Sequence, residues 1–163
     1  TAVKDYYDMD EKTFASTNEA NLELALNLDL GSSEFVYVRG KLMIKINPIY
    51  FDLDKSYIRP DAELELERVV RIMQKYPELK INFGSHTDSR ARDAYNWSLS
   101  TRRARSSKNW IVRQGIDPSR IKAEGFGETE LVNKCSNGVN CSEDDHQLNR
   151  RTEFVIVNPE VIK

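Results

Sequence analysis

Apolar and polar residues alternate strictly in the first part of the chain, and this period of two predicts β-strands. Leucine occupies every second position of the segment NLELALNLDL, from Leu22 to Leu30. Successive side chains of a strand point to opposite faces, so this pattern gives one buried and one solvated face. The alternation resumes at Val36, Val38, Leu42, Ile44 and Ile46. Residues 1–46 are therefore predicted to form a β ribbon, either the end of a preceding domain or an extra edge of the main sheet.

The remainder of the chain alternates between strand-like and helix-like segments. Strands are predicted at Ile49–Phe51, Lys80–His86, Ile121–Phe126 and Glu153–Val157. One helix is predicted to begin at Pro60, where a missing N–H costs nothing, and to end at Pro77. A second helix is predicted from Asp93 to Gln114. The order β-α-β-α-β-β predicts an α+β fold, a two-layer sandwich whose small mixed four-stranded sheet carries helices on one face.

Length and composition are those of about one domain. The 163 residues are 39% hydrophobic and 31% charged, with a net charge of -2. This balance argues against general attraction to nucleic acid or anionic lipid. The longest apolar candidate, Leu42–Phe51, falls short of a membrane span and is interrupted by polar residues. The chain opens on Thr1 rather than Met, which suggests a piece of a longer protein.

Two cysteines lie close together in the segment KCSNGVNCSEDDH. Five residues separate Cys135 from Cys141, and Gly138 allows the loop between them to turn. A small disulfide loop formed in an oxidising compartment is the leading interpretation. Two alternatives stay open, a zinc site that uses His146 and a pair of free thiols.

The most informative segment is NFGSHTDSRARDAYNWSLSTRRA, which runs from Asn82 to Ala104. It predicts a strand that delivers Asp88 to its end and a helix that carries Arg103 toward the same place. Arg103 follows Leu99 by four residues, so it lies on the inward face and needs a partner, for which Asp88 is a candidate. An acid and an arginine together suit a ligand that bears both an ammonium and a carboxylate. The alternative is a salt bridge that only joins helix to sheet.

Five motifs then match one family in order and spacing, namely IYFDLDKSYI, HTD, YNWSLSTRRA, GFGE and NRRTEFVIV. Together they resemble the outer membrane protein A-like C-terminal domain, over roughly residues 47–158. The resemblance implies a domain at residues 47–163 that binds peptidoglycan through the diaminopimelate residue of its stem peptide. It implies no catalysis, no cofactor and no metal. It also implies a location at the periplasmic face of the outer membrane, where the domain anchors a protein or complex to the cell wall.

The resemblance also implies the residues of the site. The acid of the HTD motif falls on Asp88, and the arginine of the LSxxRA motif falls on Arg103. Three further positions that line the family's pocket fall on Asp52, Asn96 and Arg150. This chain has Ala91 where many members of the family have glycine. A positive φ there would strain the alanine and change the shape of the loop.

Two other functions remain as alternatives. The helix from Arg90 to Arg113 is rich in cations and suggests a nucleic-acid or polyanion-binding module, although the domain lacks net positive charge. Alternatively, the leucine-rich ribbon docks a partner, and the domain is a structural interaction module. The GFGE segment, Gly125–Glu128, is too short for a phosphate loop and is predicted to be a turn.

Overall fold

The computed structural model describes residues 34–162, in two compact units that divide between Lys45 and Ile46. The leucine alternation from Leu22 to Leu30 lies outside the described residues. The described part of the first unit is a hairpin of β1 (Phe35–Val38) and β2 (Lys41–Ile44), paired antiparallel. Its turn consists of Arg39 and Gly40, both at positive φ, which matches the twist of paired strands. The predicted strand character of this segment is confirmed, whereas the boundary of a separate ribbon at residue 46 stays a prediction.

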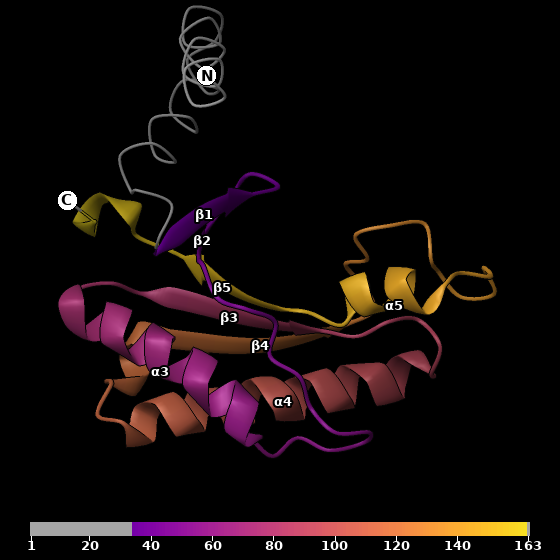
Figure 1. Ribbon diagram of the computed structural model, residues 1–163, viewed down its shortest axis with the longest axis horizontal. Coiled ribbons are helices and arrows are strands. Elements are labelled where there is room, and N and C mark those ends of the chain that lie inside the picture. The colour runs from indigo at the N-terminus through magenta and orange to yellow at the C-terminus, as the bar shows by residue number, and fades with distance from the viewer. Residues whose placement is uncertain (1–33, 163) are drawn as a thin grey trace, which may run out of the picture. The chain divides into compact units, whose positions relative to one another are not determined.

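The second unit is built on a mixed sheet (Figure 1). Its central strand β3 (Ile81–His86) pairs parallel with β4 (Ile121–Gly127) and antiparallel with β5 (Thr152–Ile156). The predicted strands from Lys80, Ile121 and Glu153 are thus confirmed, with their ends displaced by about one residue. The α+β fold class is confirmed as well.

Two long helices cover one face of this sheet (Figure 1). The helix α3 (Pro60–Lys75) has Pro60 in its first turn, and α4 (Asp93–Arg113) ends just before Gly115. Their apolar residues lie at helical spacing and are buried against the sheet. The largest buried side chains of this layer include Leu66, Val69, Met73 and Ile111 from the helices, with Ile81, Phe83, Ile121 and Phe154 from the strands. The rings of Phe83 and Phe154 are in contact at 4.6 Å between centroids, which fastens β3 to β5 at the centre of the core.

The prediction of a strand at Ile49–Phe51 is wrong, because this segment has no regular secondary structure. Side-chain bonds to Asn47 hold the chain just before this segment instead. The carboxylate of the buried Glu65 on α3 accepts hydrogen bonds from both the backbone N–H and the side-chain amide of Asn47, at 2.9 and 3.0 Å. Pro48 has no N–H to give to a ladder. Ile49 is buried, so its apolar character reflects burial in an irregular segment.

Two more elements differ from expectation. The short helix α5 (Glu143–Asn149) is absent from the predicted order, since its sequence EDDHQLN has no apolar period. The feature of the sequence that indicates this helix is the capping box formed by Ser142 and Asp145 at its start. The GFGE segment is not simply a turn, because β4 continues through Gly127.

Single-turn helices at Pro118–Arg120 and Pro159–Val161 complete the described elements. No helix within residues 34–162 is long and apolar enough to cross a membrane.

Candidate functional site

A cavity of about 690 Å³ opens at the carboxyl end of β3, in the second unit. Its walls are the loop that follows β3, one face of α4, the irregular segment that begins at Ile49, and the end of α5. The face of α4 presents Asn96, Leu99 and Arg103, which are three to four residues apart and therefore lie on one side of the helix. Four of the five predicted ligand-binding residues line this cavity: Asp88, Asn96, Arg103 and Arg150.

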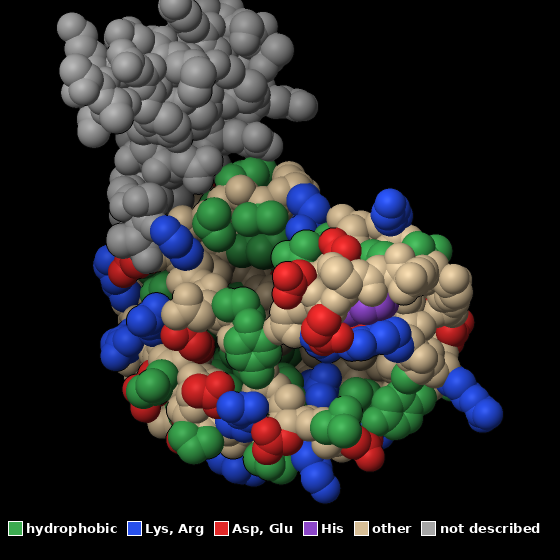
Figure 2. Space-filling view, turned by 45° about the vertical axis from the view of Figure 1, so that its right-hand side comes forward, with side chains coloured by type: hydrophobic (Ala, Val, Ile, Leu, Met, Phe, Trp, Pro, Cys, Tyr) green, Lys and Arg blue, Asp and Glu red, His purple; other side chains and the backbone are tan. Residues whose placement is uncertain are grey.

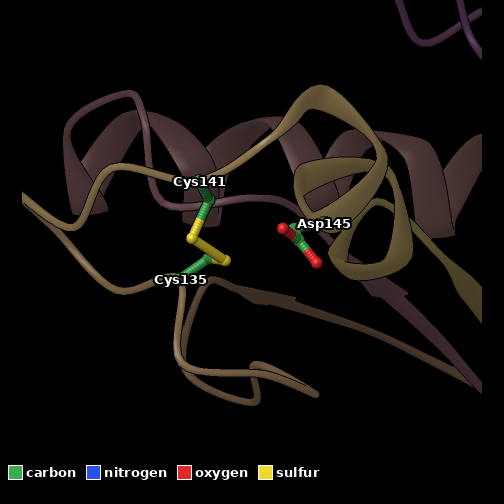
Figure 3. A group of neighbouring side chains, drawn as sticks. All are labelled: Cys135, Cys141 and Asp145. Carbon is green, nitrogen blue, oxygen red and sulfur yellow. A yellow bond between two sulfur atoms is a disulfide. The ribbon is translucent and has the colours of Figure 1, made fainter.

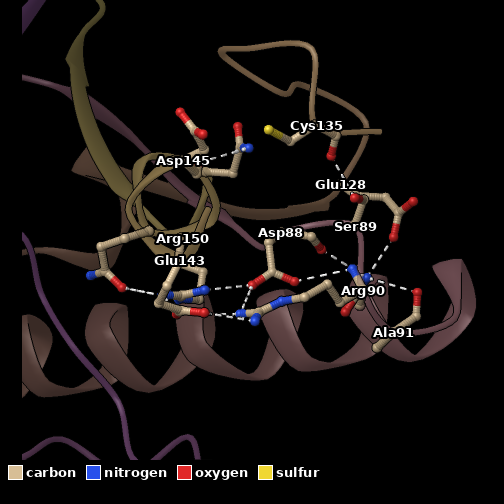
Figure 4. Close-up of polar contacts among 12 residues, drawn as sticks. Asp88, Ser89, Arg90, Ala91, Glu128, Cys135, Glu143, Asp145 and Arg150 are labelled. Carbon is tan, nitrogen blue, oxygen red and sulfur yellow. Dashed lines mark hydrogen bonds and ion pairs between the residues drawn. The ribbon is translucent and has the colours of Figure 1, made fainter. Parts of the chain in front are cut away.

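Asp88 is the most deeply buried of the three acids that line the cavity, and three donors surround its carboxylate (Figure 4). One oxygen accepts from the backbone N–H of Arg90 at 3.1 Å. The other accepts from the guanidinium groups of Arg90 at 2.8 Å and Arg150 at 2.6 Å. Burial alone would raise the pKa of Asp88, but these hydrogen bonds outweigh it and lower the pKa to about 2. Asp88 is therefore a carboxylate at any physiological pH.

Arg103 is one of the arginines that line the cavity, and its hydrogen bonds go to backbone oxygens. Its Nε donates to the carbonyl of Lys55 at 3.0 Å and its Nη2 to the carbonyl of Asp52 at 3.3 Å. The guanidinium also lies over the ring of Phe51, at 4.9 Å from the centroid. Burial lowers the pKa of Arg103, with a further contribution from neighbouring arginines. Within the described residues, no carboxylate forms an ion pair with this half-buried cation.

The predicted pairing of Asp88 with Arg103 is wrong. Arg90 is two residues from Asp88 on the same loop, and Arg150 reaches Asp88 from the end of α5, so the acid already has two cationic partners. Arg103 is instead hydrogen-bonded to backbone carbonyls of the loop at residues 52–55. Asp88 and Arg103 thus line one cavity without forming the helix-to-sheet salt bridge that was the alternative interpretation.

The remaining predicted residues take different positions. Asp52 does not line the cavity, and its carboxylate bonds with Tyr57 and, at 3.1 Å, with Arg59. Asn96 is 3% exposed, and its amide donates to the carbonyls of Asp88 at 3.0 Å and Ala91 at 3.3 Å. It therefore braces the loop that carries Asp88. Ala91 has no positive φ, so alanine at this position is not strained.

Two residues of the site were missed from the sequence. Arg90 belongs to the same loop as Asp88, and its position two residues later was the signal available. Glu143 on α5 bonds with both Arg90, at 2.7 Å, and Arg150. No local pattern marks Glu143, because its partners are brought to it by the path of the chain between β4 and β5.

A disulfide joins Cys135 to Cys141 in the segment that precedes α5, which confirms the leading interpretation (Figure 3). Both sulfurs are consumed in this bond, so they are not available as zinc ligands. The carbonyl of Cys135 accepts a hydrogen bond from the Ser89 hydroxyl at 2.5 Å. The disulfide loop is thereby tied to the residue next to Asp88, and it supports one wall of the site.

Charges of both signs surround the site. Figure 2 shows acidic and basic side chains interspersed over this side of the molecule, without a broad basic patch. This distribution does not favour the polyanion-binding alternative on this face.

Fold and site together define a class of protein: a small α+β domain whose cavity is lined by the Asp88 carboxylate and by the Arg103 guanidinium, which forms no ion pair with a carboxylate among the described residues. A model of the OmpA family matches residues 50–144, and the chain belongs to the OmpA family.

Three relatives show how much of a longer protein this domain accounts for. The chain is 38% identical to outer membrane porin F of Pseudomonas fluorescens over 116 residues. These residues are 71% of this chain and 32% of that protein. Over 87 residues it is 33% identical to the peptidoglycan-associated lipoprotein of Brucella melitensis, 53% of this chain and 52% of that protein. A Gloeobacter violaceus protein named Photosystem I P700 chlorophyll a apoprotein A2 is 39% identical over 119 residues, 72% of this chain and 14% of that protein. The chain thus spans about half or less of these proteins.

Solved structures share the fold. The putative MotB-like protein of Desulfovibrio vulgaris superposes with a TM-score of 0.64 at 24% identity, over 96% of this chain and 95% of its own. The peptidoglycan-associated lipoprotein of Burkholderia pseudomallei superposes with a TM-score of 0.59 at 22% identity, over 69% of this chain and 90% of its own. The cell wall anchor of the T6SS from Pseudomonas aeruginosa superposes with a TM-score of 0.57 at 23% identity, over 80% of this chain and 92% of its own.

Proposed function

We propose that this domain binds peptidoglycan non-covalently through the diaminopimelate residue of the stem peptide. It would thereby anchor an outer-membrane protein or complex to the cell wall, from the periplasmic side, without catalysing a reaction. Membership of the OmpA family supports this proposal, as do relatives and structural neighbours whose names refer to peptidoglycan association or cell wall anchoring.

The state of Arg103 is the observation that carries the proposal. Among residues 34–162 no carboxylate pairs with this half-buried guanidinium, which is electrostatically costly, and an anionic ligand group would offset that cost. The bonds of Arg103 to Asp52 and Lys55 use its Nε and one hydrogen of Nη2. Nη1 and the second hydrogen of Nη2 are left for the two oxygens of a ligand carboxylate.

Asp88 provides the complementary half of the proposed site. A carboxylate has about four lone-pair positions, and three are occupied by donors from Arg90 and Arg150. The fourth is available to an ammonium. Diaminopimelate carries an ammonium and a carboxylate on the same carbon at its free end, so it would satisfy Asp88 and Arg103 together. Asn96 would keep the Asp88 loop in place, and Arg150 would orient the Asp88 carboxylate.

This arrangement predicts discrimination against lysine-type stem peptides. A lysine side chain offers the ammonium but no carboxylate, which leaves Arg103 without its anion. Because a hydrogen bond to a charged group contributes about 1.5–3 kcal/mol, we expect at least a tenfold preference for diaminopimelate.

The test is a calorimetric titration with meso-diaminopimelate, with lysine as the control ligand. It compares the wild type with Arg103→Ala and with Arg105→Ala, a change of the same kind on the exposed side of α4. Saturable binding of diaminopimelate by the wild type and Arg105→Ala, lost in Arg103→Ala, is the expected result. Equal binding of lysine, or unchanged binding by Arg103→Ala, would contradict the proposal.

A further inference from the structure

Four charged side chains beside the cavity form a closed ring of alternating sign (Figure 4). Asp88 and Glu143 are its acids, and Arg90 and Arg150 lie between them, each bonded to both acids. All four residues line the cavity: Asp88 and Arg90 belong to the loop after β3, whereas Glu143 and Arg150 lie at the two ends of α5, and Glu143 is 53 residues from Arg90 in the sequence. The ring as a whole has no net charge.

The net charge of this ring changes if Glu143 is not counted. Asp88 would then stand beside two guanidinium groups, and the three residues together would carry a net charge of +1. A group with that balance repels an ammonium and attracts a carboxylate. Glu143 removes this bias because its charge brings the net charge of the group to zero, so that the remaining lone pair of Asp88 can accept from an ammonium without net repulsion.

We infer that Glu143 determines the charge selectivity of the ammonium half of the site. It makes this half accept an ammonium rather than a second carboxylate, although it is not itself required for the fold of the cavity. This inference rests on the proposed function, because it assumes that the ligand's ammonium binds at Asp88.

The position of Glu143 is fixed by structure rather than by chance contact. It is the first residue of α5, whose capping box, made by Ser142 and Asp145, sets where the helix begins. The segment before α5 is closed by the Cys135–Cys141 disulfide and bonded to Ser89 on the Asp88 loop. Glu143 therefore reaches the two arginines from an element that is itself attached to the site.

The inference is tested with two ligands that differ only in their ammonium groups. Pimelic acid has the carbon chain and both carboxylates of diaminopimelate but no amine. Glu143→Gln removes the charge and keeps the size of the side chain. Asp144→Asn removes the same charge from the next residue of α5, which forms no ion pair with either arginine in the part of the chain that the structure describes.

The measured quantity is the ratio of the two dissociation constants, by calorimetry at low salt, with thermal unfolding as a check on the fold. Glu143→Gln is expected to weaken diaminopimelate binding and to strengthen pimelate binding, each about three- to fivefold, because Glu143 is largely exposed and screened. Asp144→Asn is expected to leave the ratio within about twofold of wild type.

If the ratio of the diaminopimelate and pimelate dissociation constants is the same in Glu143→Gln as in Asp144→Asn, the inference is overturned, while the proposed function stays intact. The same holds if both ligands weaken together, which would indicate a structural role for Glu143. A folded wild type that binds neither ligand would instead overturn the proposed function, and the inference with it.

Discussion

Asp88 and Arg103 line the same cavity, yet each makes its bonds elsewhere: Asp88 with Arg150 at 2.6 Å, and Arg103 with the carbonyl of Lys55 at 3.0 Å. An acid and an arginine that neutralised each other would leave little for a ligand. Here the acid is held ionised by other cations, and the arginine is held in place by neutral carbonyls. Their opposite charges therefore remain available for a zwitterionic group placed between them.

Replacement of Arg103 by lysine tests whether geometry matters as well as charge. Lysine keeps the positive charge but cannot bond in parallel to both oxygens of a carboxylate or bridge Asp52 and Lys55. We expect Arg103→Lys to lose about tenfold or more in affinity for diaminopimelate. Calorimetric titration measures this loss, and affinity equal to wild type would show that charge alone suffices.

Replacement of Asp88 by asparagine is expected to affect both binding and stability. Arg90 and Arg150 lose their shared, largely buried carboxylate and keep the exposed Glu143 as their acidic partner, with Gln147 as a neutral acceptor for Arg150. The free energy of unfolding should fall by about 1–3 kcal/mol, because a charge-assisted hydrogen-bond network is broken. Urea denaturation measures the change. Asp61→Asn, which disrupts the exposed pair with Arg59, is the control and should cost less than about 1 kcal/mol. Equal losses in the two variants would contradict the assignment.

The low pKa of Asp88 predicts how stability changes in acid. The folded protein holds this carboxylate ionised to a pKa of about 2, below the ordinary value of 3.8. Asp88 therefore contributes stability that is fully present above about pH 4 and is lost as the pH falls toward 2. The stability difference between wild type and Asp88→Asn should be constant from pH 7 to 5 and should shrink between pH 4 and 2. A difference that already shrinks between pH 7 and 5 would place the relevant titration on another group.

Gly125 on β4 is predicted to tolerate no side chain. A Cβ at this position would lie 2.1 Å from the backbone nitrogen of Thr101 and 2.5 Å from the carbonyl carbon of Ser100, both on α4. Backbone atoms of a packed helix cannot yield as a flexible side chain can, so Gly125→Ala should destabilise the protein by about 3 kcal/mol or more. Gly84→Ala is the comparison, since its Cβ would meet only side chains of His86 and Phe126, at 3.2 Å. If Gly84→Ala proves the more damaging in thermal unfolding, the close approach of α4 to β4 is not the reason for the glycine.

Loss of the Cys135–Cys141 disulfide should have a modest effect on stability and a measurable effect on binding. The bond joins residues six apart in sequence, and a loop of this size restricts the unfolded chain by only about 2 kcal/mol. Because Ser89 bonds to the carbonyl of Cys135 beside the site, reduction should also weaken diaminopimelate binding a few-fold. Titrations with and without reductant measure this change. A double Cys→Ser variant controls for the reagent, since its affinity should not respond to reductant.

The sequence by itself determined the two helices, the three strands of the second unit, and the placement of Asp88 and Arg103 at one cavity. These features follow from periods of two and 3.6 residues, which record which side of each element is buried, and from the motifs that match the family. Local patterns also marked the two cysteines as a pair.

Only the tertiary structure decided which charges meet. The bond between Arg150 and Asp88 spans 62 residues, and that between Arg90 and Glu143 spans 53. Such contacts depend on the path of the chain between β4 and β5 and on α5, a helix that no apolar period in the sequence predicts. The prediction of a strand at Ile49–Phe51 is wrong for a related reason, because burial of an apolar residue does not specify whether the backbone around it bonds to a strand or, as at Asn47, to a side chain such as Glu65. A periodic pattern reports the burial of each position, whereas the partner of a side chain is set by segments that the pattern does not contain.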